Sequence, residues 1–180
     1  DAFELARKCG FDNINTDLIA GLPTDTPESF KNSLDSIVRL NAECITVHTL
    51  CMKRASRLTT EGVTLDLQQA RDAREMLAYT QNILGQNEYI PYYMYRQSRM
   101  VGNLENVGWS KKGFESLYNV YVMDETHTIL ACGSGGVTKL KRNNPDYLER
   151  IFNFKYPYEY IDRFDELIQR KSGIMQFYGQ

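Results

Sequence analysis

Residues 15–30 decide the fold of this chain and read NTDLIAGLPTDTPESF. The nearly unbroken apolar run from residue 14 to residue 22 predicts a strand covered on both faces, as in a parallel sheet. Thr26 is a favoured residue at a helix N-cap, and Pro27 suits the first helical position because its missing N–H is not needed there. The segment therefore predicts a strand–turn–helix unit of an α/β fold.

One acidic residue, Asp17, interrupts the apolar run of this strand. An unpaired carboxylate is so costly to bury that it changes its protonation state instead. We therefore expect Asp17 to have a partner, which is either a bound ligand or a lysine or arginine at the end of a strand.

The strand–helix pattern repeats along the first half of the chain. Residues 43–50 predict a second strand, residues 66–84 predict a helix that ends at Gly85, and residues 89–95 predict a third strand. Pro91 removes one ladder donor from that third strand. With the helix expected near the start of the chain, this order indicates a slice of a βα-repeat barrel or open sheet.

The pattern changes after residue 96, so we predict two parts, residues 1–96 and residues 97–180. Residues 97–113 predict an irregular loop because they are rich in Gly, Asn, Ser and Lys. Three short antiparallel strands are expected at 118–123, 128–132 and 137–140. A short helix is expected from about Pro145, and a longer one from Pro157 with Ile161, Phe164 and Ile168 on its inner face.

Composition excludes several classes of protein. Lys and Arg number 21 against 23 Asp and Glu, giving a net charge of −2, which argues against a nucleic-acid-binding protein. No run of about 18 apolar residues is present, so we expect no membrane span. The four scattered cysteines indicate free thiols in a reducing cytoplasm.

Several segments carry a likeness to a known family, namely residues 14–23, 26–30, 40–41, 45–50, 95–97, 100–108 and 129–136. In these segments the chain resembles the radical S-adenosylmethionine (SAM) enzymes related to oxygen-independent coproporphyrinogen III oxidase. Residues 95–97 and 100–108 look most like the branch called coproporphyrinogen dehydrogenase. The resemblance implies the C-terminal portion of a (βα)6 partial barrel, followed by a small antiparallel sheet and C-terminal helices.

The resemblance also implies an activity for the whole parent protein. Such an oxidoreductase uses SAM, a [4Fe–4S] cluster and an electron donor to decarboxylate the propionates of a tetrapyrrole, coproporphyrinogen III, to vinyl groups in haem biosynthesis. The alternative is a chaperone-like relative that shares the scaffold and binds haem without oxidase activity.

The family's cofactor contacts fall on three residues of this chain. Asp17 corresponds to the acid that binds the ribose hydroxyls of SAM, which an acceptor-only carboxylate can do. Ile19 corresponds to an apolar or backbone contact on the adenine side, and Cys51 to a further adenine contact. The alternatives are an acid paired with a basic side chain for Asp17, and plain packing for Ile19 and Cys51.

A cluster of Tyr92, Tyr93, Tyr95 and Arg96 is expected at the end of the third strand, and Tyr95 and Arg96 are its candidate substrate residues. A ring beside a cation suits a tetrapyrrole that bears carboxylates, and aromatic packing over a barrel mouth is the alternative. Further candidates for pairing with a propionate are Arg54, Arg57 and Arg99.

The iron–sulfur cluster of the family is the main departure from this resemblance. The cluster needs a Cys-x3-Cys-x2-Cys loop, and Cys9, Cys44, Cys51 and Cys132 do not have that spacing. We expect no metal ligands in this chain, the cluster loop upstream of residue 1, and no activity from the 180 residues alone.

Two further features are open to two interpretations. His48 is either a polar site residue or a satisfied core histidine. The segment Gly133–Gly136 is either an anion cradle or a tight turn between strands.

Overall fold

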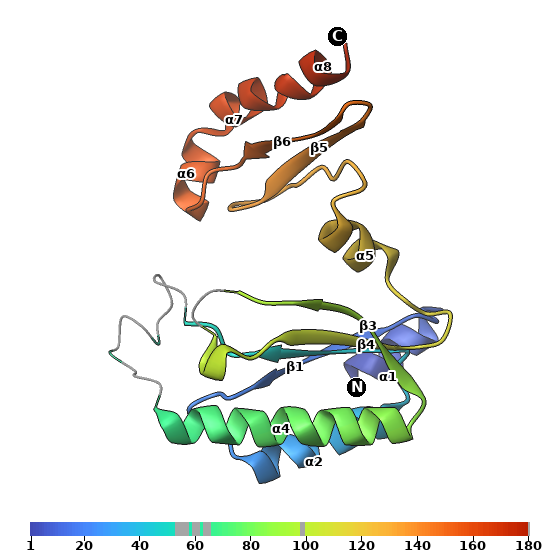
Figure 1. Ribbon diagram of the computed structural model, residues 1–180. Coiled ribbons are helices and arrows are strands. Elements are labelled where there is room, and N and C mark those ends of the chain that lie inside the picture. The colour runs from blue at the N-terminus through green and yellow to red at the C-terminus, as the bar shows by residue number, and fades with distance from the viewer. Residues whose placement is uncertain (53–57, 59–61, 63–65, 98–99, 180) are drawn as a thin grey trace. The chain divides into compact units, whose positions relative to one another are not determined.

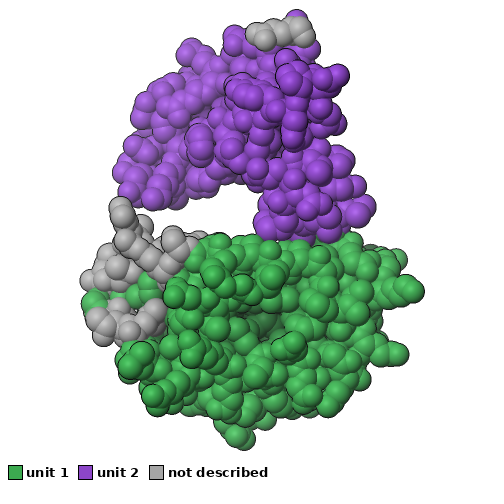
Figure 2. Space-filling view, in the orientation of Figure 1, with its two compact units in different colours: residues 1–116 green, residues 117–180 purple. Residues whose placement is uncertain are grey.

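The computed structural model describes residues 1–52, 58, 62, 66–97 and 100–179. The chain divides into two compact units, Asp1–Ser116 and Leu117–Gln180, which Figure 2 shows in different colours. Each unit has its own sheet and its own helices. The fold is α/β in the first unit, with a small antiparallel sheet and helices following it in the second.

The first unit contains a mixed four-stranded sheet in the order β1-β2-β4-β3. Its strands are β1 (Asn15–Ala20), β2 (Cys44–Thr49), β3 (Tyr89–Tyr95) and β4 (Asn106–Lys111). β1 and β2 are parallel, while β4 is antiparallel to both β2 and β3. β1, β2 and β3 therefore run in one direction, as in a barrel slice, and β4 lies between the last two.

The loop predicted across residues 97–113 is wrong, because this segment contains the 3-10 turn η1 (Val101–Asn103) and β4. The sequence of β4 gives no strand signal of its own, because Gly108 is explained only by its packing against the neighbouring strand β3. A Cβ atom on Gly108 would lie 1.8 Å from Cε1 of Tyr93, so the tyrosine ring occupies the space that a side chain would need.

Two helices cover one face of this sheet, α2 (Pro27–Leu40) and α4 (Leu67–Gln86) (Figure 1). The predicted N-cap of α2 is confirmed, since Thr26 Oγ1 accepts from Ser29 N–H at 3.2 Å and Pro27 follows it. The core between helices and sheet contains Phe30, Leu34, Ile45, Val47, Met76, Leu84 and Trp109. A further helix of the described part of this unit, α1 (Ala2–Lys8), precedes β1.

Gly85 does not end α4, which continues to Gln86. The Asn87 side chain supplies the stop instead, because its Nδ2 donates to the Ile83 carbonyl at 2.8 Å. The Asn87 backbone N–H donates to the same carbonyl at 3.2 Å, so this end of the helix is hydrogen-bonded without a glycine cap.

β1 is not covered on both faces, contrary to the prediction from its apolar run. Leu18 and Ala20 face the helices, whereas Ile19 is 42% exposed on the opposite face. The strand alternates because helices pack on only one face of the described sheet.

The second unit contains α5 (Leu117–Asp124), the antiparallel pair β5 (Val137–Asn143) and β6 (Asp146–Phe152), and α6 (Pro157–Asp162), α7 (Phe164–Lys171) and α8 (Gly173–Tyr178). The strand expected at 118–123 is therefore a helix, and the helix expected from Pro145 is a strand. Residues 128–132 form no strand and contribute only an isolated bridge between Ile129 and Lys139. For the residues after Pro145, the pairing of β6 with β5 overrides the local preference.

The inner face of the C-terminal helices also differs from the prediction. Leu167 is buried at 1% exposure, whereas Ile161, Phe164 and Ile168 are 71%, 47% and 52% exposed. The small core of this unit instead gathers Leu140, Ile151 and Phe177. The region expected as one helix from Pro157 is divided into α6 and α7, and Leu167 of α7 is the residue that is buried.

Candidate functional site

The face of the β1–β4 sheet that the helices leave open is polar and aromatic. Residues that pair across adjacent strands share a face, so the register places alternate residues of all four strands on it. Its side chains come from Asn15, Asp17 and Ile19 of β1, Thr46 and His48 of β2, Tyr93 and Tyr95 of β3, and Asn106 of β4.

Asp17 begins a chain of hydrogen bonds across this open face. Its Oδ1 accepts from Asn15 Nδ2 at 2.7 Å, and Asn15 Oδ1 accepts from Thr46 Oγ1 at 3.1 Å. Thr46 Oγ1 lies 3.4 Å from the Tyr93 hydroxyl. Among the partners that the structure describes, Asp17 has no lysine or arginine, and its side chain is 58% exposed. The carboxylate is therefore oriented by neighbours and remains accessible.

His48 connects Asp17 to the aromatic side of the site. Its Nε2 lies 3.8 Å from Asp17 Oδ1, and its Nδ1 lies 3.3 Å from the Tyr95 hydroxyl. The side chain is 30% exposed, and the ring meets Tyr95 edge to face with centroids 6.4 Å apart. The interpretation of His48 as a buried core histidine does not fit these contacts.

Tyr93 and Tyr95 stand next to each other on the open face. Their rings are stacked with centroids 6.2 Å apart and an interplanar angle of 6°. Burial raises the pKa of both hydroxyls above the ordinary value of 10.0. Both side chains therefore keep their hydroxyl protons at neutral pH and can donate hydrogen bonds.

A cavity of about 310 Å³ opens where β1, β2 and β3 end. It is lined by Ile19, His48, Thr49, Leu50, Cys51, Tyr95, Gln97 and Asn106. Three residues proposed from the sequence, Ile19, Cys51 and Tyr95, thus line one cavity, and Asp17 lies next to its His48 wall. Strand C-terminal ends are where βα-barrel enzymes place their sites.

Arg96 lies apart from this group. It pairs with Glu105 at 2.5 Å and lines a different cavity of about 670 Å³, whose walls include Tyr92, Leu77 and Trp109. Tyr95 lines the 310 Å³ cavity and Arg96 lines the other one, so these two residues do not form one wall. The other candidate cations, Arg54, Arg57 and Arg99, lie outside the described residues.

The segment Gly133–Gly136 has its backbone donors engaged within the second unit. Gly133 N–H donates to the Tyr160 hydroxyl at 3.2 Å, and Gly135 N–H donates to the Phe154 carbonyl at 2.7 Å. Gly136 N–H donates to the Gly133 carbonyl at 3.3 Å. These bonds favour the tight turn over the anion cradle.

The cysteines do not form a site for an iron–sulfur cluster. Cys44 donates its S–H to the Phe114 carbonyl at 3.0 Å, and burial raises its pKa to about 11, so it stays a thiol. Cys9 and Cys132 are exposed in separate units. Across the part of the chain that the structure describes, no three His, Cys, Asp or Glu side chains gather as metal ligands.

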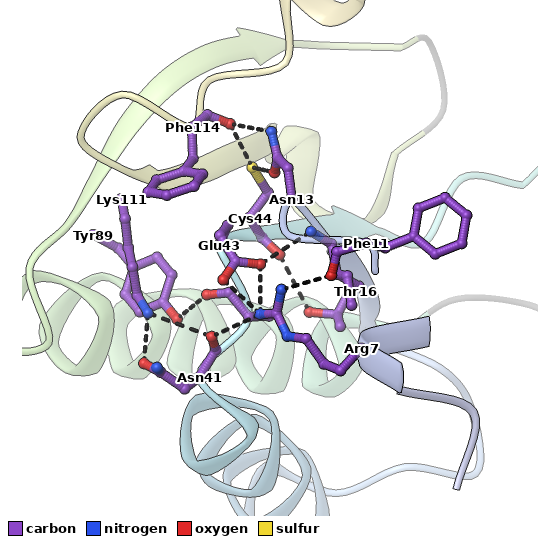
Figure 3. A network of polar contacts seen from close by, with 12 residues as sticks. Arg7, Phe11, Asn13, Thr16, Asn41, Glu43, Cys44, Tyr89, Lys111 and Phe114 are labelled. Atoms are coloured by element: carbon purple, nitrogen blue, oxygen red, sulfur yellow. Dashed lines mark hydrogen bonds and ion pairs between the residues drawn. The ribbon is translucent and has the colours of Figure 1, made fainter. Parts of the chain in front are cut away.

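A second polar network, which the sequence analysis missed, lies where β2 begins (Figure 3). Arg7 donates to both carboxylate oxygens of Glu43, at 2.5 and 2.6 Å, and Ile14 N–H donates to Glu43 Oε2 at 3.0 Å. Burial raises the pKa of Glu43, but the bonds from Arg7 and Ile14 outweigh it and hold the pKa below 4.5. This network joins α1, β1 and β2 at the end of the sheet opposite the cavity.

No model of a known protein family matches the chain. The oxygen-independent coproporphyrinogen-III oxidase-like protein HemZ of Bacillus subtilis (strain 168) is 36% identical over 98% of this chain and 35% of its own length. The heme chaperone HemW of Lactococcus lactis subsp. lactis (strain IL1403) is 29% identical over 80% of this chain and 36% of its own length.

A solved structure of coproporphyrinogen III oxidase (HemN) from Escherichia coli, described as a radical SAM enzyme, has a TM-score of 0.59 to this chain. The two sequences are 18% identical, and the match covers 91% of this chain and 36% of the HemN chain. The fold is therefore that of the radical SAM class.

Within that class, the chain belongs to the family of proteins related to oxygen-independent coproporphyrinogen III oxidase. It spans about a third of the length of the relatives that it matches. No helix among the described residues is long and apolar enough to cross a membrane.

Proposed function

We propose that this chain supplies the nucleoside-binding part of a SAM site in a haem-related radical SAM protein. The observation that carries the proposal is the accessible Asp17 carboxylate beside a cavity lined by Ile19 and Cys51. Asp17 binds the ribose hydroxyls, while Ile19 and Cys51 contact the adenine side.

The residues present fit the nucleoside half of SAM. An ionised carboxylate only accepts hydrogen bonds and can take both protons of a sugar diol. Ile19, at 42% exposure, offers an apolar surface against which a ring can pack. When bound, SAM supplies the radical chemistry that starts hydrogen abstraction, while the residues of this chain bind and orient its nucleoside.

The residues present do not fit the [4Fe–4S] cluster, because no three cysteines have the required spacing. We therefore assign the cluster ligands, and the contact with an electron donor, to other parts of the whole protein. The four cysteines at scattered positions are consistent with a reducing cytoplasm.

For the whole protein we propose oxidation of a tetrapyrrole, in which the propionates of coproporphyrinogen III lose carbon dioxide and become vinyl groups. The likeness to HemZ and HemN supports this activity. In this proposal Tyr95, which lines the cavity, faces the tetrapyrrole. Arg96 reaches a propionate only if it leaves Glu105, with which it is paired here.

A second candidate is a haem-binding chaperone. The likeness to HemW over 80% of the chain favours it. The two functions differ in outcome when the whole protein meets coproporphyrinogen III with SAM and a reductant under anaerobic conditions. A divinyl product supports the oxidase, and retention of added haem without turnover supports the chaperone.

The nucleoside site itself is tested by calorimetric titration of the 180-residue chain with adenosine. Replacing Asp17 by Asn removes the negative acceptor and should weaken binding about 10- to 100-fold, since a hydrogen bond to a charged group contributes about 1.5–3 kcal/mol. Asp12→Asn, an exposed acid in the same unit, is the matched control. Equal affinities for the wild type and D17N would contradict the proposal.

A further inference from the structure

The open face contains one imidazole, His48, whose contacts determine which of its nitrogens carries the proton. Its Nδ1 faces the Tyr95 hydroxyl at 3.3 Å, and its Nε2 faces Asp17 Oδ1 at 3.8 Å. The protonation state of each nitrogen therefore depends on what the Tyr95 hydroxyl does.

The neighbouring amide orients the Tyr95 hydroxyl. Asn106 Oδ1 accepts from Thr49 N–H at 2.7 Å, which turns the Asn106 NH2 group the other way. Asn106 pairs in register with Tyr95, and its side chain lowers the pKa of the Tyr95 hydroxyl, as a group that donates to the phenol oxygen does. Since the amide NH2 can only donate, the Tyr95 oxygen accepts from it, and the Tyr95 hydrogen is left for His48.

His48 Nδ1 is therefore an acceptor, and the neutral ring carries its proton on Nε2. The Nε2–H group then stands beside the Asp17 carboxylate. Their separation of 3.8 Å exceeds a direct hydrogen bond, which has a length of about 2.7–3.2 Å. One oxygen atom can nevertheless lie within about 2.8 Å of both atoms.

A donor and an acceptor in this arrangement are complementary to a hydroxyl group. The hydroxyl hydrogen goes to the carboxylate, while its oxygen accepts from Nε2–H. A carbon-bound hydrogen in the same place can do neither. The Nε2–H group of His48 and the Asp17 carboxylate would then both lack a hydrogen-bond partner on the ligand.

We infer that His48 is a specificity residue of the nucleoside site, which binds one sugar hydroxyl jointly with Asp17 and so selects ribonucleosides over deoxyribonucleosides. This inference rests on the proposed function of Asp17. It adds a donor to a site in which the carboxylate only accepts.

The test is a cycle that removes the imidazole and the hydroxyl separately and together. The wild-type chain, His48→Phe and His48→Gln are titrated with adenosine, 2′-deoxyadenosine and 3′-deoxyadenosine. His127→Phe is the matched control, because it changes the second of the chain's two histidines, which lies in the other unit.

We expect the wild type to bind adenosine about tenfold more tightly than either deoxynucleoside. H48F should lose about 3- to 10-fold in affinity for adenosine and nothing for the one deoxynucleoside that lacks the shared hydroxyl. H48Q, whose amide can donate, should recover part of this loss, and H127F should behave as wild type. A nitrogen-15 spectrum of the free chain should show His48 protonated on Nε2.

Different failures have different meanings. If H48F weakened the binding of all three nucleosides equally, His48 would have a purely structural role and the inference would be overturned. The proposed function would still stand in that case, provided that D17N weakens adenosine binding. Protonation on Nδ1 would also overturn it. A wild-type chain that binds no adenosine would contradict both proposals.

Discussion

Two of the contacts between a carboxylate and a basic side chain in the first unit lie toward opposite ends of its four-stranded sheet. The Arg7–Glu43 pair, where β2 begins, has two short bonds and a Glu43 side chain that is only 11% exposed. The His48–Asp17 pair, toward the other end, is 3.8 Å apart with Asp17 58% exposed. A closed pair is directly hydrogen-bonded within the protein and stabilises the fold, whereas an open pair keeps bonding capacity for a ligand.

The largest expected effect is a difference in stability between variants of the two carboxylates, Glu43 and Asp17. Glu43→Gln should lower the free energy of unfolding by about 2 kcal/mol, because it leaves the partly buried Arg7 without its charge partner. Asp17→Asn should change it by less than about 0.5 kcal/mol, as for most exposed positions. Urea unfolding followed by circular dichroism measures both. Similar losses for the two variants would remove the distinction between closed and open pairs.

Gly108 tests whether the open face needs its exact packing. Gly108→Ala should cost about 1–2 kcal/mol, since the new Cβ would lie 1.8 Å from the Tyr93 ring and the ring would have to move. Displacing Tyr93 should also break its contact with Thr46. Gly113→Ala is a less suitable control because of its positive φ, so Gly85→Ala, with open space around it in α4, serves instead. A G108A variant as stable as wild type would contradict the close approach.

The closed pair also predicts how stability depends on pH. The pKa of Glu43 is lower in the folded state than its ordinary value of 4.5, so its contribution to stability is complete above that value. The contribution is lost as the pH falls through the folded pKa, because the unfolded state binds the proton first. Unfolding curves between pH 3 and pH 7 should show this loss in the wild type and a smaller one in E43Q. Parallel curves would show that other carboxylates are responsible.

The closed pair also illustrates which parts of the structure were predictable from the sequence. β1, α2 and β2 were predicted because their signals are local, such as the Thr26 cap and the apolar runs. The Arg7–Glu43 pair was missed because its partners are 36 residues apart and neither belongs to a recognisable motif. β4 was missed for a similar reason, since its pairing with β2 and β3 decides its conformation and its glycine-containing sequence does not.

Some members of the candidate site were proposed from the sequence, but Asn15, Thr46 and Asn106 were not, and neither was its arrangement. Strand ends and family likeness led to Asp17, Ile19, Cys51 and Tyr95, and the last three line one cavity. The sequence did not reveal that Tyr95 and Arg96 line different cavities.

The smallest effect concerns Ile19, which lies on β1 two residues from Asp17 and pairs in register with His48. Ile19→Ala should change stability by less than about 1 kcal/mol, because the side chain is already 42% exposed and leaves little cavity behind. It should nevertheless weaken adenosine binding about 3-fold, through the apolar area lost against the ring. Leu18→Ala is the matched control, since Leu18 packs toward the helices and should affect stability more than binding. If I19A and L18A changed stability and affinity in the same proportion, the two faces of β1 would not have separate roles, one in binding and the other in stability.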